Sequence, residues 1–499
     1  MSSNQPSASY TRGFEGTFSE STVNEFPTKL LLDGQWLEGV GVDKLVVTNP
    51  ATEETFAEVS SATAGEIDKA VIAGQSVFKS SWRDMPPGQR AELLHGIAKL
   101  IRENTESLAQ LETRNVGKPI GDARWEVDAG AKVFEYYAGA IGHLCGQTIP
   151  VARGGFDFTL RQPLGVVAAI TPWNFPFLIA CWKVAPALAA GNSVVLKPAS
   201  LTTMNALSLG QLVQEAGLPD GVLQVLPGSG YDVGNALATH PLVRKISFTG
   251  STEVGSKIMK LAADDIKRVS LELGGKSPNI VFADADWQRA AAESPMSVFA
   301  NTGQDCCARS RMFIEQSIFD DFVDQFVSSS EKLNIGDPLI DETQIGPMVS
   351  AAQRELSESF IAEAKSNDRN ILTGGERLSG SGFYLKPAVI TGADINDRIW
   401  KEEIFGPVVC LRSVSDEGEM LSGVNDTSFG LSGSVWSRDL SRALRVANRV
   451  ESGVISINSH SSVHTEAPFG GFKSSGLGRD LGMSAMEACT EVKNIYVGE

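Results

Sequence analysis

The strongest constraint on the fold is an alternation of short apolar segments with helical segments in the middle of the chain. From residue 164 onward, helical patterns at Ala180–Ala190, Met204–Ala216 and Asp232–Thr239 separate the apolar runs GVVAAITP, SVVLKP, VLQVLPG and KISFTG. Apolar strands that alternate with helices predict βαβ units and a parallel sheet covered on both faces. We therefore expect an α/β domain in this region.

A second alternation begins near Asn279, so we expect a second α/β domain. It contains PNIVFADAD, a helical pattern over Trp287–Thr302, and the apolar runs RMFIEQ, PVVCLRSV and GLSGSVWS. We expect the boundary between the two domains close to Leu271–Gly275. Upstream, residues 62–137 have helical spacing, and Asp33-Gly34 in KLLLDGQWLEGV is a hairpin turn signal. A chain of 499 residues is long enough for two or three domains.

Composition narrows the class of protein. The formal net charge of -17 argues against non-specific binding to nucleic acid or to an anionic membrane, because both are polyanions. We find no uninterrupted apolar run of 18 residues, so we expect no transmembrane helix. The six cysteines are scattered apart from one adjacent pair, which favours a reducing, cytoplasmic setting. No HxxxH or CxxC spacing predicts a metal site, and residues 1–27 are interpreted as a loose polar tail.

Cys306 lies in the string NTGQDCCARSR, in a polar context that follows a predicted helix. Arg309 and Arg311 follow closely, and nearby positive charge favours the thiolate, the nucleophilic form of cysteine. A buried cysteine is more often a small apolar side chain. From composition alone, a catalytic and a structural Cys306 are about equally supported.

Two further motifs carry polar residues at the ends of predicted strands. Glu272 ends the apolar run VSLEL before two glycines, and burial there would raise its pKa and make it a general base. Asn174 lies in ITPWNFPF, where its amide could stabilise an oxyanion. The structural alternatives are a solvated Glu272 at a strand edge and an Asn174 that caps its own turn.

Glycine-rich turns after two strands suggest a phosphate site. KISFTGSTEVG and PGSGYDVG both place glycines where a helix begins, which allows a phosphate to approach the backbone and the helix dipole. Each signal is weak alone. The G-x-G-x-x-G spacing is absent, because residues 228–234 contain one residue too many.

Seven strings, in this order, resemble the aldehyde dehydrogenase superfamily: ITPWNFP, SVVLKPAS, FTGSTEVG, LELGGK, GQDCC, EEIFGPV and PFGGFKSSGLGR. The resemblance runs from about Thr28 to the C-terminus. It implies that Cys306 attacks an aldehyde carbon, and that Asn174 and the backbone N–H of Cys306 stabilise the oxyanion. Glu272 would then activate the water that hydrolyses the thioester. Cys307 fits less well, because the family's active cysteine lies two residues after the glutamine, here Gln304.

The resemblance also implies a nicotinamide dinucleotide as hydride acceptor. Relatives that transfer the acyl group to coenzyme A lack a glutamate at the position of Glu272, so its presence favours hydrolysis. Ser200 stands where NAD-preferring members often have a glutamate that would repel a 2′-phosphate, so both NAD and NADP are expected. The residues expected to bind the cofactor are Thr171, Trp173, Lys197, Ser200, Gly230, Gly234, Phe248, Ser251, Glu403 and Phe405.

The fold implied is α/β: a Rossmann-like parallel-sheet cofactor domain, an α/β catalytic domain and a small β oligomerisation arm. We expect the cofactor domain at residues 28–141 and 163–271 and the catalytic domain at 272–475. The arm would combine residues 142–162 and 476–499. Such an arm implies a homodimer or homotetramer formed by strand addition between subunits.

The substrate is expected to be a small-molecule aldehyde. Phe175, Trp182, Phe299 and Phe469 are candidates for the wall of its tunnel, although aromatic residues are as often plain core, and Asp305, beside the nucleophile, would favour a cationic tail. This favours an ω-aminoaldehyde such as 4-aminobutyraldehyde, although Asp305 could equally cap a turn. Ala300 provides neither an arginine for succinic semialdehyde nor a tryptophan for betaine aldehyde. The alternatives are a broad aliphatic, aromatic or betaine aldehyde dehydrogenase and, more remotely, a non-catalytic member of the superfamily.

Overall fold

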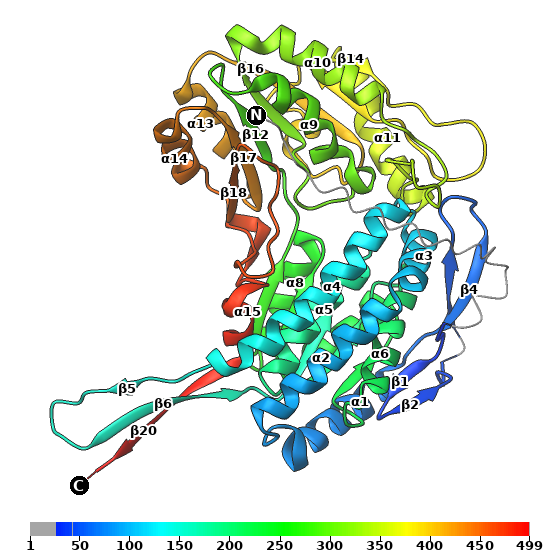
Figure 1. Cartoon of the computed structure of the whole chain (residues 1–499). Helices are drawn as coiled ribbons and strands as arrows, with labels where there is room; N and C mark the ends of the chain where they lie inside the picture. Colours follow the sequence, from blue (N-terminus) through cyan, green and yellow to red (C-terminus); the bar gives the residue numbers. More distant parts are fainter. Residues whose placement is uncertain (1–25, 42, 499) are drawn as a thin grey trace, which may run out of the picture.

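The computed structural model describes residues 26–41 and 43–498 (Figure 1). Except for residues 26 and 27, the tail expected at residues 1–27 lies outside the described residues. Within the described part, one sheet has eight strands in the order β19-β11-β10-β7-β8-β9-β1-β2. A second has seven in the order β14-β15-β16-β13-β12-β17-β18, and two smaller sheets pair β20-β6-β5 and β3-β4. The α/β class with parallel sheets is confirmed.

The strands of the first half are β1 (Leu30–Leu32), β2 (Gln35–Leu37), β3 (Lys44–Thr48), β4 (Thr55–Ser60), β5 (Thr148–Ile149), β6 (Phe156–Pro163), β7 (Val166–Ile170), β8 (Ser193–Lys197), β9 (Leu223–Val225), β10 (Val243–Thr249) and β11 (Arg268–Glu272). Those of the second half are β12 (Pro278–Val281), β13 (Arg311–Glu315), β14 (Asn370–Thr373), β15 (Ala388–Thr391), β16 (Val408–Val414), β17 (Ser432–Trp436), β18 (Val454–Ile457), β19 (Gly476–Leu477) and β20 (Thr490–Val497).

The helices are α1 (Ala64–Val77), α2 (Pro87–Glu103), α3 (Thr105–Val116), α4 (Ile120–Ala140), α5 (Pro176–Ala189), α6 (Met204–Glu215), α7 (Asn235–Thr239), α8 (Thr252–Ala263), α9 (Trp287–Phe299), α10 (Phe319–Glu331), α11 (Ala351–Ser366), α12 (Arg398–Lys401), α13 (Glu417–Asn425), α14 (Leu440–Arg449) and α15 (Gly482–Glu487).

The strand order of the eight-stranded sheet reverses beside β7. The chain runs outward from β7 through β8 to β9, then returns to add β10 and β11 on the other side of β7, all parallel. The carboxyl ends of these strands therefore lie at one edge of the sheet, with a crevice where the order reverses. The predicted hairpin at Asp33-Gly34 is confirmed, because β1 and β2 pair antiparallel on either side of it.

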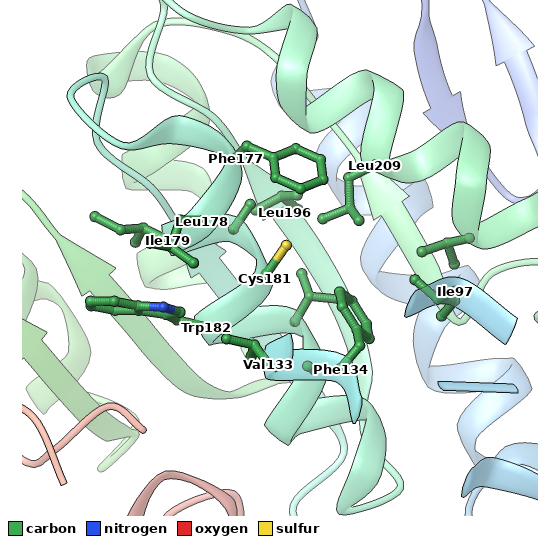
Figure 2. Close-up of a cluster of buried hydrophobic side chains, with 14 of the residues drawn as sticks. Ile97, Val133, Phe134, Phe177, Leu178, Ile179, Cys181, Trp182, Leu196 and Leu209 are labelled. Atoms are coloured by element: carbon green, nitrogen blue, oxygen red, sulfur yellow. The ribbon is translucent and has the colours of Figure 1, made fainter. Parts of the chain in front are cut away.

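Helix α5 is buried along its whole length and forms the centre of the largest hydrophobic core. Figure 2 shows Cys181 pointing into this core near Leu196 and Leu209, so this cysteine is a packing residue. The helix begins at Pro176, four residues before the predicted start at Ala180. Proline suits the first turn of a helix because its missing N–H is not needed there.

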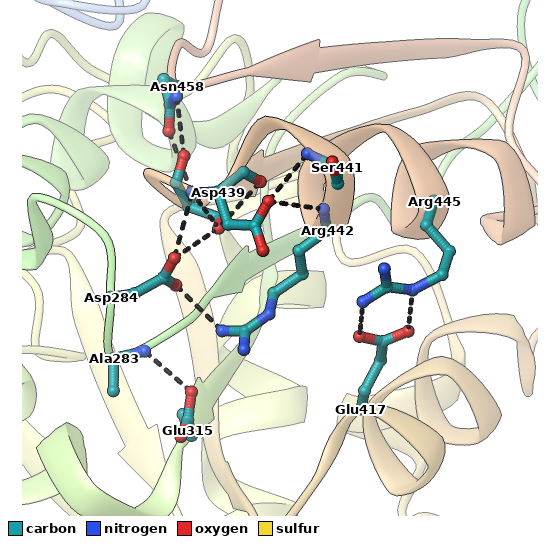
Figure 3. Close-up of polar contacts among 10 residues, drawn as sticks. Ala283, Asp284, Glu315, Glu417, Asp439, Ser441, Arg442, Arg445 and Asn458 are labelled. Atoms are coloured by element: carbon teal, nitrogen blue, oxygen red, sulfur yellow. Dashed lines mark hydrogen bonds and ion pairs between the residues drawn. The ribbon is translucent and has the colours of Figure 1, made fainter.

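In the second domain, acidic side chains attach α14 to the sheet. The Asp439 carboxylate caps α14 by accepting hydrogen bonds from the backbone N–H groups of Ser441 and Arg442. The Arg442 guanidinium donates to Asp284, which follows β12, over 3.0 Å (Figure 3). Arg445 forms a two-pronged ion pair with Glu417 at the start of α13. These contacts fix the outer helices, and none reaches the cavity described below.

The helix predicted over Trp287–Thr302 is wrong at its end, because α9 stops at Phe299. Asn301 and Thr302 have φ values of 49° and 57°, and Gly303 has a φ of 72°. Three successive left-handed residues cannot continue a right-handed helix. The chain therefore reverses direction immediately before the GQDCC string.

Strands β5, β6 and β20 form a separate antiparallel sheet that extends away from the body of the molecule (Figure 1). Large apolar side chains on it are exposed, among them Phe156, Leu160, Val492 and Tyr496. β19, which falls in the segment expected for the arm, instead pairs with β11 at the edge of the eight-stranded sheet. Within residues 26–41 and 43–498, no helix combines the length and apolar character needed to cross a membrane.

Candidate active site

A cavity of about 730 Å³ brings together residues from both large domains. Cys306 and Glu272 both line it, as do Ala300, Asn301, Arg309 and Val463. Of the residues expected to contact the substrate, Phe175, Trp182, Asp305 and Phe469 line this cavity, whereas Phe299 is buried in a hydrophobic cluster of the second domain and does not line it. The nucleophile, the general base and the substrate wall predicted from the sequence therefore meet in one place.

Glu272 ends β11 at the carboxyl edge of the sheet, in register with Thr249 at the end of β10. Its side chain is buried, and neither carboxylate oxygen has a hydrogen-bond partner among the described residues. Burial raises the pKa of Glu272 well above its usual value, and the charge of Asp480 raises it further. The buried Lys183, 3.0 Å from Asp480, opposes this shift. A buried carboxyl with unused oxygens and a raised pKa is suited to accept a proton.

The left-handed turn at residues 301–303 sets the position of the nucleophile's loop. A Cβ on Gly303 would lie 2.2 Å from the Gly406 carbonyl oxygen, so only glycine fits here. The Thr302 hydroxyl donates to the Gly346 carbonyl over 2.9 Å. A Cβ on Gly275 would lie 2.3 Å from the Cys306 carbonyl oxygen, which explains a glycine in the LELGGK string as a point of close approach. These contacts hold the GQDCC loop between distant segments.

Side-chain amides link this turn to the ITPWNFPF loop. The Asn174 Nδ2 donates to the Gln304 carbonyl over 3.0 Å, and the Asn301 Nδ2 donates to the Asn174 carbonyl, also over 3.0 Å. Gln304 Nε2 donates to the Asn301 carbonyl, and Gln304 Oε1 accepts from the Val349 N–H. Asn174 thus lies directly beneath the nucleophile's loop with one amide hydrogen committed to it. Sequence reasoning missed Asn301, although an Asn before Thr-Gly favours left-handed backbone.

The Asp305 carboxylate and the sulfur atoms of Cys306 and Cys307 lie within 4.8 Å of one another. The hydrogen bond with Cys307, and then burial, raise the pKa of the Cys306 thiol well above its usual value. Burial also raises the pKa of Asp305, while the Cys307 N–H, which donates to its Oδ1 over 2.8 Å, opposes that shift. Cys307 is buried and Cys306 is partly exposed, so Cys306 is the more accessible of the two thiols.

The structure separates the two arginines that follow the nucleophile. Arg311 begins β13 and donates to the backbone carbonyls of Lys276, Gly423 and Val424. Its role is to join loops of the second domain, and it does not line the cavity. Arg309 is equally buried and does line the cavity.

Several residues expected to bind the cofactor lie at the carboxyl edge of the eight-stranded sheet. The Thr171 hydroxyl follows β7 and has no partner among the described residues. Lys197 ends β8, where burial lowers its pKa to about 8 and its ammonium group donates to the Pro198 carbonyl over 2.8 Å. The Ser200 hydroxyl donates to the Gly228 carbonyl over 3.0 Å. Lys197 and Ser200 thus flank the glycine-rich turn that follows β9.

The glycine-rich turns differ in what they offer a ligand. A Cβ on Gly230 or on Gly234 would meet no atom within 4 Å, but Gly234 is buried, so of these two glycines only Gly230 has an exposed backbone. The Ser251 hydroxyl caps α8 by accepting from the Val254 N–H over 3.3 Å. Phe248 is buried in the hydrophobic cluster with Leu271, with its ring against the backbone of Gly250. Phe248 is therefore part of the core, and its expected contact with the cofactor stays a prediction.

The segment after α12 contacts the loops that follow β7 and β11. Glu403 accepts from the Gly275 N–H over 3.0 Å, and burial raises its pKa to about 7. The Phe405 and Trp173 rings meet edge to face, with centroids 5.2 Å apart. Glu403 and the aromatic pair therefore connect the second domain to the strand edge where the other candidate cofactor residues lie.

The substrate wall has an apolar and a charged part. The Trp182 and Phe469 rings lie 5.4 Å apart, and the Phe175 ring packs 4.2 Å from the buried Lys118 ammonium. Lys118 in turn pairs with the buried carboxylates of Glu112 and Glu126. Besides Lys118 and Glu272, the ionisable lining residues of this cavity include Asp122, Glu293, Asp305 and Arg309.

The chain is similar to known proteins over nearly its whole length. The family model described as "Aldehyde dehydrogenase family" matches residues 36–495. An aminoaldehyde dehydrogenase of Malus domestica is 42% identical over 483 residues, 94% of this chain and 96% of the relative. A betaine aldehyde dehydrogenase of Staphylococcus aureus in complex with NAD+ is 35% identical, covers 97% of each chain and has a TM-score of 0.94. An NADP-dependent enzyme of E. coli is 38% identical, covers 95% of this chain and 99% of its own, and has a TM-score of 0.94.

Proposed function

The chain belongs to the aldehyde dehydrogenase family and is an NAD(P)-dependent oxidoreductase that acts on aldehydes; from this premise we propose that it produces the free carboxylic acid through an acyl group on Cys306. The observation that carries the proposal is the buried Glu272 carboxyl, whose oxygens lack partners among the described residues and which lines the same cavity as Cys306. A base in that position can activate the water that hydrolyses the acyl group.

The first step is attack by the Cys306 sulfur on the aldehyde carbon. Because the pKa of this thiol is raised, its proton must be lost to solvent as the S–C bond forms. The carbonyl oxygen becomes an oxyanion. The second hydrogen of the Asn174 amide and the backbone N–H of Cys306 are the donors that would stabilise it.

The crevice residues fit a dinucleotide. The unpartnered Thr171 hydroxyl, the buried Lys197 ammonium and the exposed backbone at Gly230 leave polar groups and space for a ribose and phosphates. A bound nicotinamide would supply the hydride acceptor for the carbon attached to Cys306, and loss of that hydride would leave an acyl thioester on Cys306. Glu272 then takes a proton from water as the water oxygen attacks the thioester. The C–S bond breaks, and the Cys306 sulfur recovers a proton as the acid leaves.

The substrate proposed first is an ω-aminoaldehyde such as 4-aminobutyraldehyde. Asp122, Glu293 and Asp305 line the cavity and would attract a cationic tail. Several similar proteins are named aminoaldehyde dehydrogenases. Asp305 is the weakest part of the support, since its Oδ1 already accepts the Cys307 N–H.

A bulkier apolar aldehyde is the second candidate, and the size of the cavity favours it. A cavity of about 730 Å³ is within the range of drug-sized ligand sites and far exceeds the volume of a six-heavy-atom aminoaldehyde. Ala300 and Val463 are short side chains on its wall, and Phe175, Trp182 and Phe469 are apolar. A broad aliphatic or aromatic specificity follows if these surfaces contribute most of the binding energy.

Both NAD and NADP are proposed as acceptors. Ser200 carries no negative charge toward a ribose 2′-phosphate, and similar structures include an NAD+ complex and an NADP-dependent enzyme.

The proposed domains are residues 28–141 with 163–271 for the cofactor, 272–475 for catalysis, and 142–162 with 476–499 for the arm. Exposed apolar groups on the β5-β6-β20 sheet support a homodimer or homotetramer, and six free cysteines support a reducing, cytoplasmic setting.

The proposal is tested by initial rates of reduced-cofactor formation with 4-aminobutyraldehyde, betaine aldehyde, succinic semialdehyde and an aromatic aldehyde. Each is run with NAD and with NADP, using wild type, Cys306→Ala and, as a matched control, Cys307→Ala. We expect turnover by wild type and Cys307→Ala and none by Cys306→Ala. Turnover by Cys306→Ala would contradict the mechanism, and a leading aromatic aldehyde would replace the aminoaldehyde proposal with the second candidate.

A further inference from the structure

The first turn of α5 is held by a side chain from another helix. The helix begins at Pro176, its N-cap residue Phe175 makes no side-chain hydrogen bond to it, and its first turn contains no acidic residue. The first N–H groups of a helix have no intrahelical acceptor and attract negative charge. The Glu126 carboxylate of α4 provides such an acceptor, because its Oε1 accepts the Leu178 N–H over 3.1 Å.

Lys118 fixes this carboxylate in turn. Glu126 is fully buried, and its second oxygen, Oε2, pairs with the Lys118 ammonium. The same ammonium lies 3.2 Å from the Glu112 carboxyl of α3 and 4.2 Å from the centre of the Phe175 ring. Burial raises the pKa of Glu112 well above its usual value, and the charge of Glu126 raises it further, which leaves Glu126 as the charged partner of Lys118. A carboxylate engaged at both oxygens within the core has little freedom to move.

A short and restricted segment joins the first turn of α5 to Asn174. Asn174 lies two residues before the helix and four residues before Leu178. Pro176 limits the backbone between them, because its ring fixes its own φ and restricts the conformation of Phe175. The Phe175 carbonyl accepts the Ile179 N–H over 3.0 Å, which ties the segment to the helix. A shift of the first turn is therefore transmitted to Asn174.

We propose that Glu126 is a positioning residue for Asn174, because its carboxylate sets where the first turn of α5 lies. Lys118 holds that carboxylate in place. The inference rests on the proposed role of Asn174 as an oxyanion donor. Glu126 is not among the residues that line the cavity, so it acts on the reaction only through the helix that follows Asn174. A donor displaced by about 1 Å from a developing oxyanion loses much of its stabilising effect.

The two carboxyl groups that flank Lys118 provide a matched pair of variants. Glu126→Leu and Glu112→Leu each remove a fully buried carboxyl group and leave the ammonium with one carboxyl partner. The second oxygen of Glu112 accepts from the Asn205 amide of α6, so Glu112→Leu loosens α6 instead of the start of α5. The midpoint of urea unfolding, kcat and KM are measured for both variants, and Glu126→Leu is also combined with Asn174→Ala.

We expect both leucine variants to lose stability, but only Glu126→Leu to lose kcat, by about tenfold or more, with its KM changed less than about threefold. Added to Asn174→Ala, Glu126→Leu should lower kcat by less than about a further threefold, because the donor that it positions is already absent. An equal fall of kcat in the two leucine variants would overturn the proposal, as would an undiminished fall in the Asn174→Ala background. Wild-type kcat in Asn174→Ala alone would instead overturn the proposed role of Asn174, and this inference with it.

A milder pair of variants keeps the proposal testable if the leucine variants do not fold. Glu126→Asp and Glu112→Asp keep a carboxyl group beside Lys118 but shorten the side chain by one methylene. The shorter side chain at position 126 cannot reach both the ammonium and the Leu178 N–H without moving α5, so we expect kcat to fall about threefold or more in Glu126→Asp and less in Glu112→Asp. Equal kcat values in the two aspartate variants would overturn the proposal.

Discussion

Replacing Asn301 tests how the left-handed turn before the nucleophile is held. Asn301 has a φ of 49° and donates its amide hydrogens to the carbonyls of Asn174 and Gln304 over 3.0 and 3.3 Å. Gln304 keeps a second donor, the Asn174 amide, whereas the Asn174 carbonyl has no other hydrogen-bond donor among the described residues. The change Asn301→Ala therefore leaves one buried carbonyl without a partner and imposes left-handed backbone on alanine.

The two costs can be estimated separately. A buried carbonyl left without a donor costs about 1–3 kcal/mol, and left-handed backbone costs a residue such as alanine about 1–2 kcal/mol. We expect Asn301→Ala to lose about 2–5 kcal/mol in the free energy of unfolding. Asn301→Gly removes the same hydrogen bonds but tolerates the turn, so we expect it to lose only the first part.

The measurement compares urea-unfolding midpoints of wild type, Asn301→Ala and Asn301→Gly, together with kcat for one aldehyde. The glycine variant should be the more stable of the two by about 1–2 kcal/mol. Both should lose kcat, because the Gln304 carbonyl and the loop that follows it are less firmly held. Equal midpoints for the two variants would refute the claim that strain is stored in this turn, and wild-type midpoints for both would refute the role of the amide.

Three further changes probe the base, the cofactor crevice and the substrate wall. Because burial raises the pKa of Glu272, its base form appears only as pH rises through that raised value, and kcat should rise with pH over the same range. Glu272→Gln should lose this rise with pH, and its kcat should fall about 10²–10⁴-fold. A pre-steady-state burst of reduced cofactor should remain in this variant, because the acyl group still forms on Cys306. Loss of the burst in Glu272→Gln would contradict this assignment, because it would show that Glu272 also acts before the hydrolysis step. Ser200→Glu should raise the KM for NADP at least about tenfold and change the KM for NAD little, because a carboxylate repels the 2′-phosphate. Initial rates at varied cofactor concentration measure both constants, and an unchanged KM for NADP would show that Ser200 does not lie near the ribose. Ala300→Phe should reduce kcat/KM for an aromatic aldehyde by about tenfold or more and spare 4-aminobutyraldehyde, whereas equal losses for both would show that the ring blocks the nucleophile itself.

The sign of the pH effect on stability follows from the same carboxyl group. Burial makes the protonated form of Glu272 the favoured one in the folded chain, so its pKa is higher in the folded than in the unfolded state. Its contribution to stability is then fully present below the unfolded pKa and is lost as pH rises through the folded pKa. The deprotonated base that catalysis requires is therefore maintained at a cost in stability.

Much of the fold follows from periodicity in the sequence. The runs around Val167, Val194 and Ile246 are β-strands because continuous apolar character suits a strand buried on both faces. The prediction of a helix through Thr302 was wrong because the contacts that end this helix come from distant parts of the chain. The turn is fixed by Gly303 against Gly406 and by Thr302 against Gly346, contacts that join residues far apart in the chain.

The site was predicted in part for the same reason. Glu272 ends a strand, and Cys306 lies between a helix and a strand, at approximate positions that the apolar pattern of the sequence indicates. Both residues line the cavity. Arg309 and Arg311 are equivalent in the sequence, yet Arg309 precedes β13 and lines the cavity, whereas Arg311 begins β13 and donates to backbone carbonyls away from the cavity. Phe248 lies in a hydrophobic cluster at β10, and its expected contact with the cofactor stays a prediction.

The most direct test of the central claim is the mass of the active-site peptide from Glu272→Gln after brief exposure to an aldehyde and oxidised cofactor. Without the base, hydrolysis is slowed and the acyl group should accumulate on Cys306, with Cys307 unmodified. The account predicts a peptide heavier by the acyl group of the aldehyde used, stable to acid and released by hydroxylamine. An unmodified Cys306 in a variant that still reduces the cofactor, or an acyl group on Cys307, would contradict it.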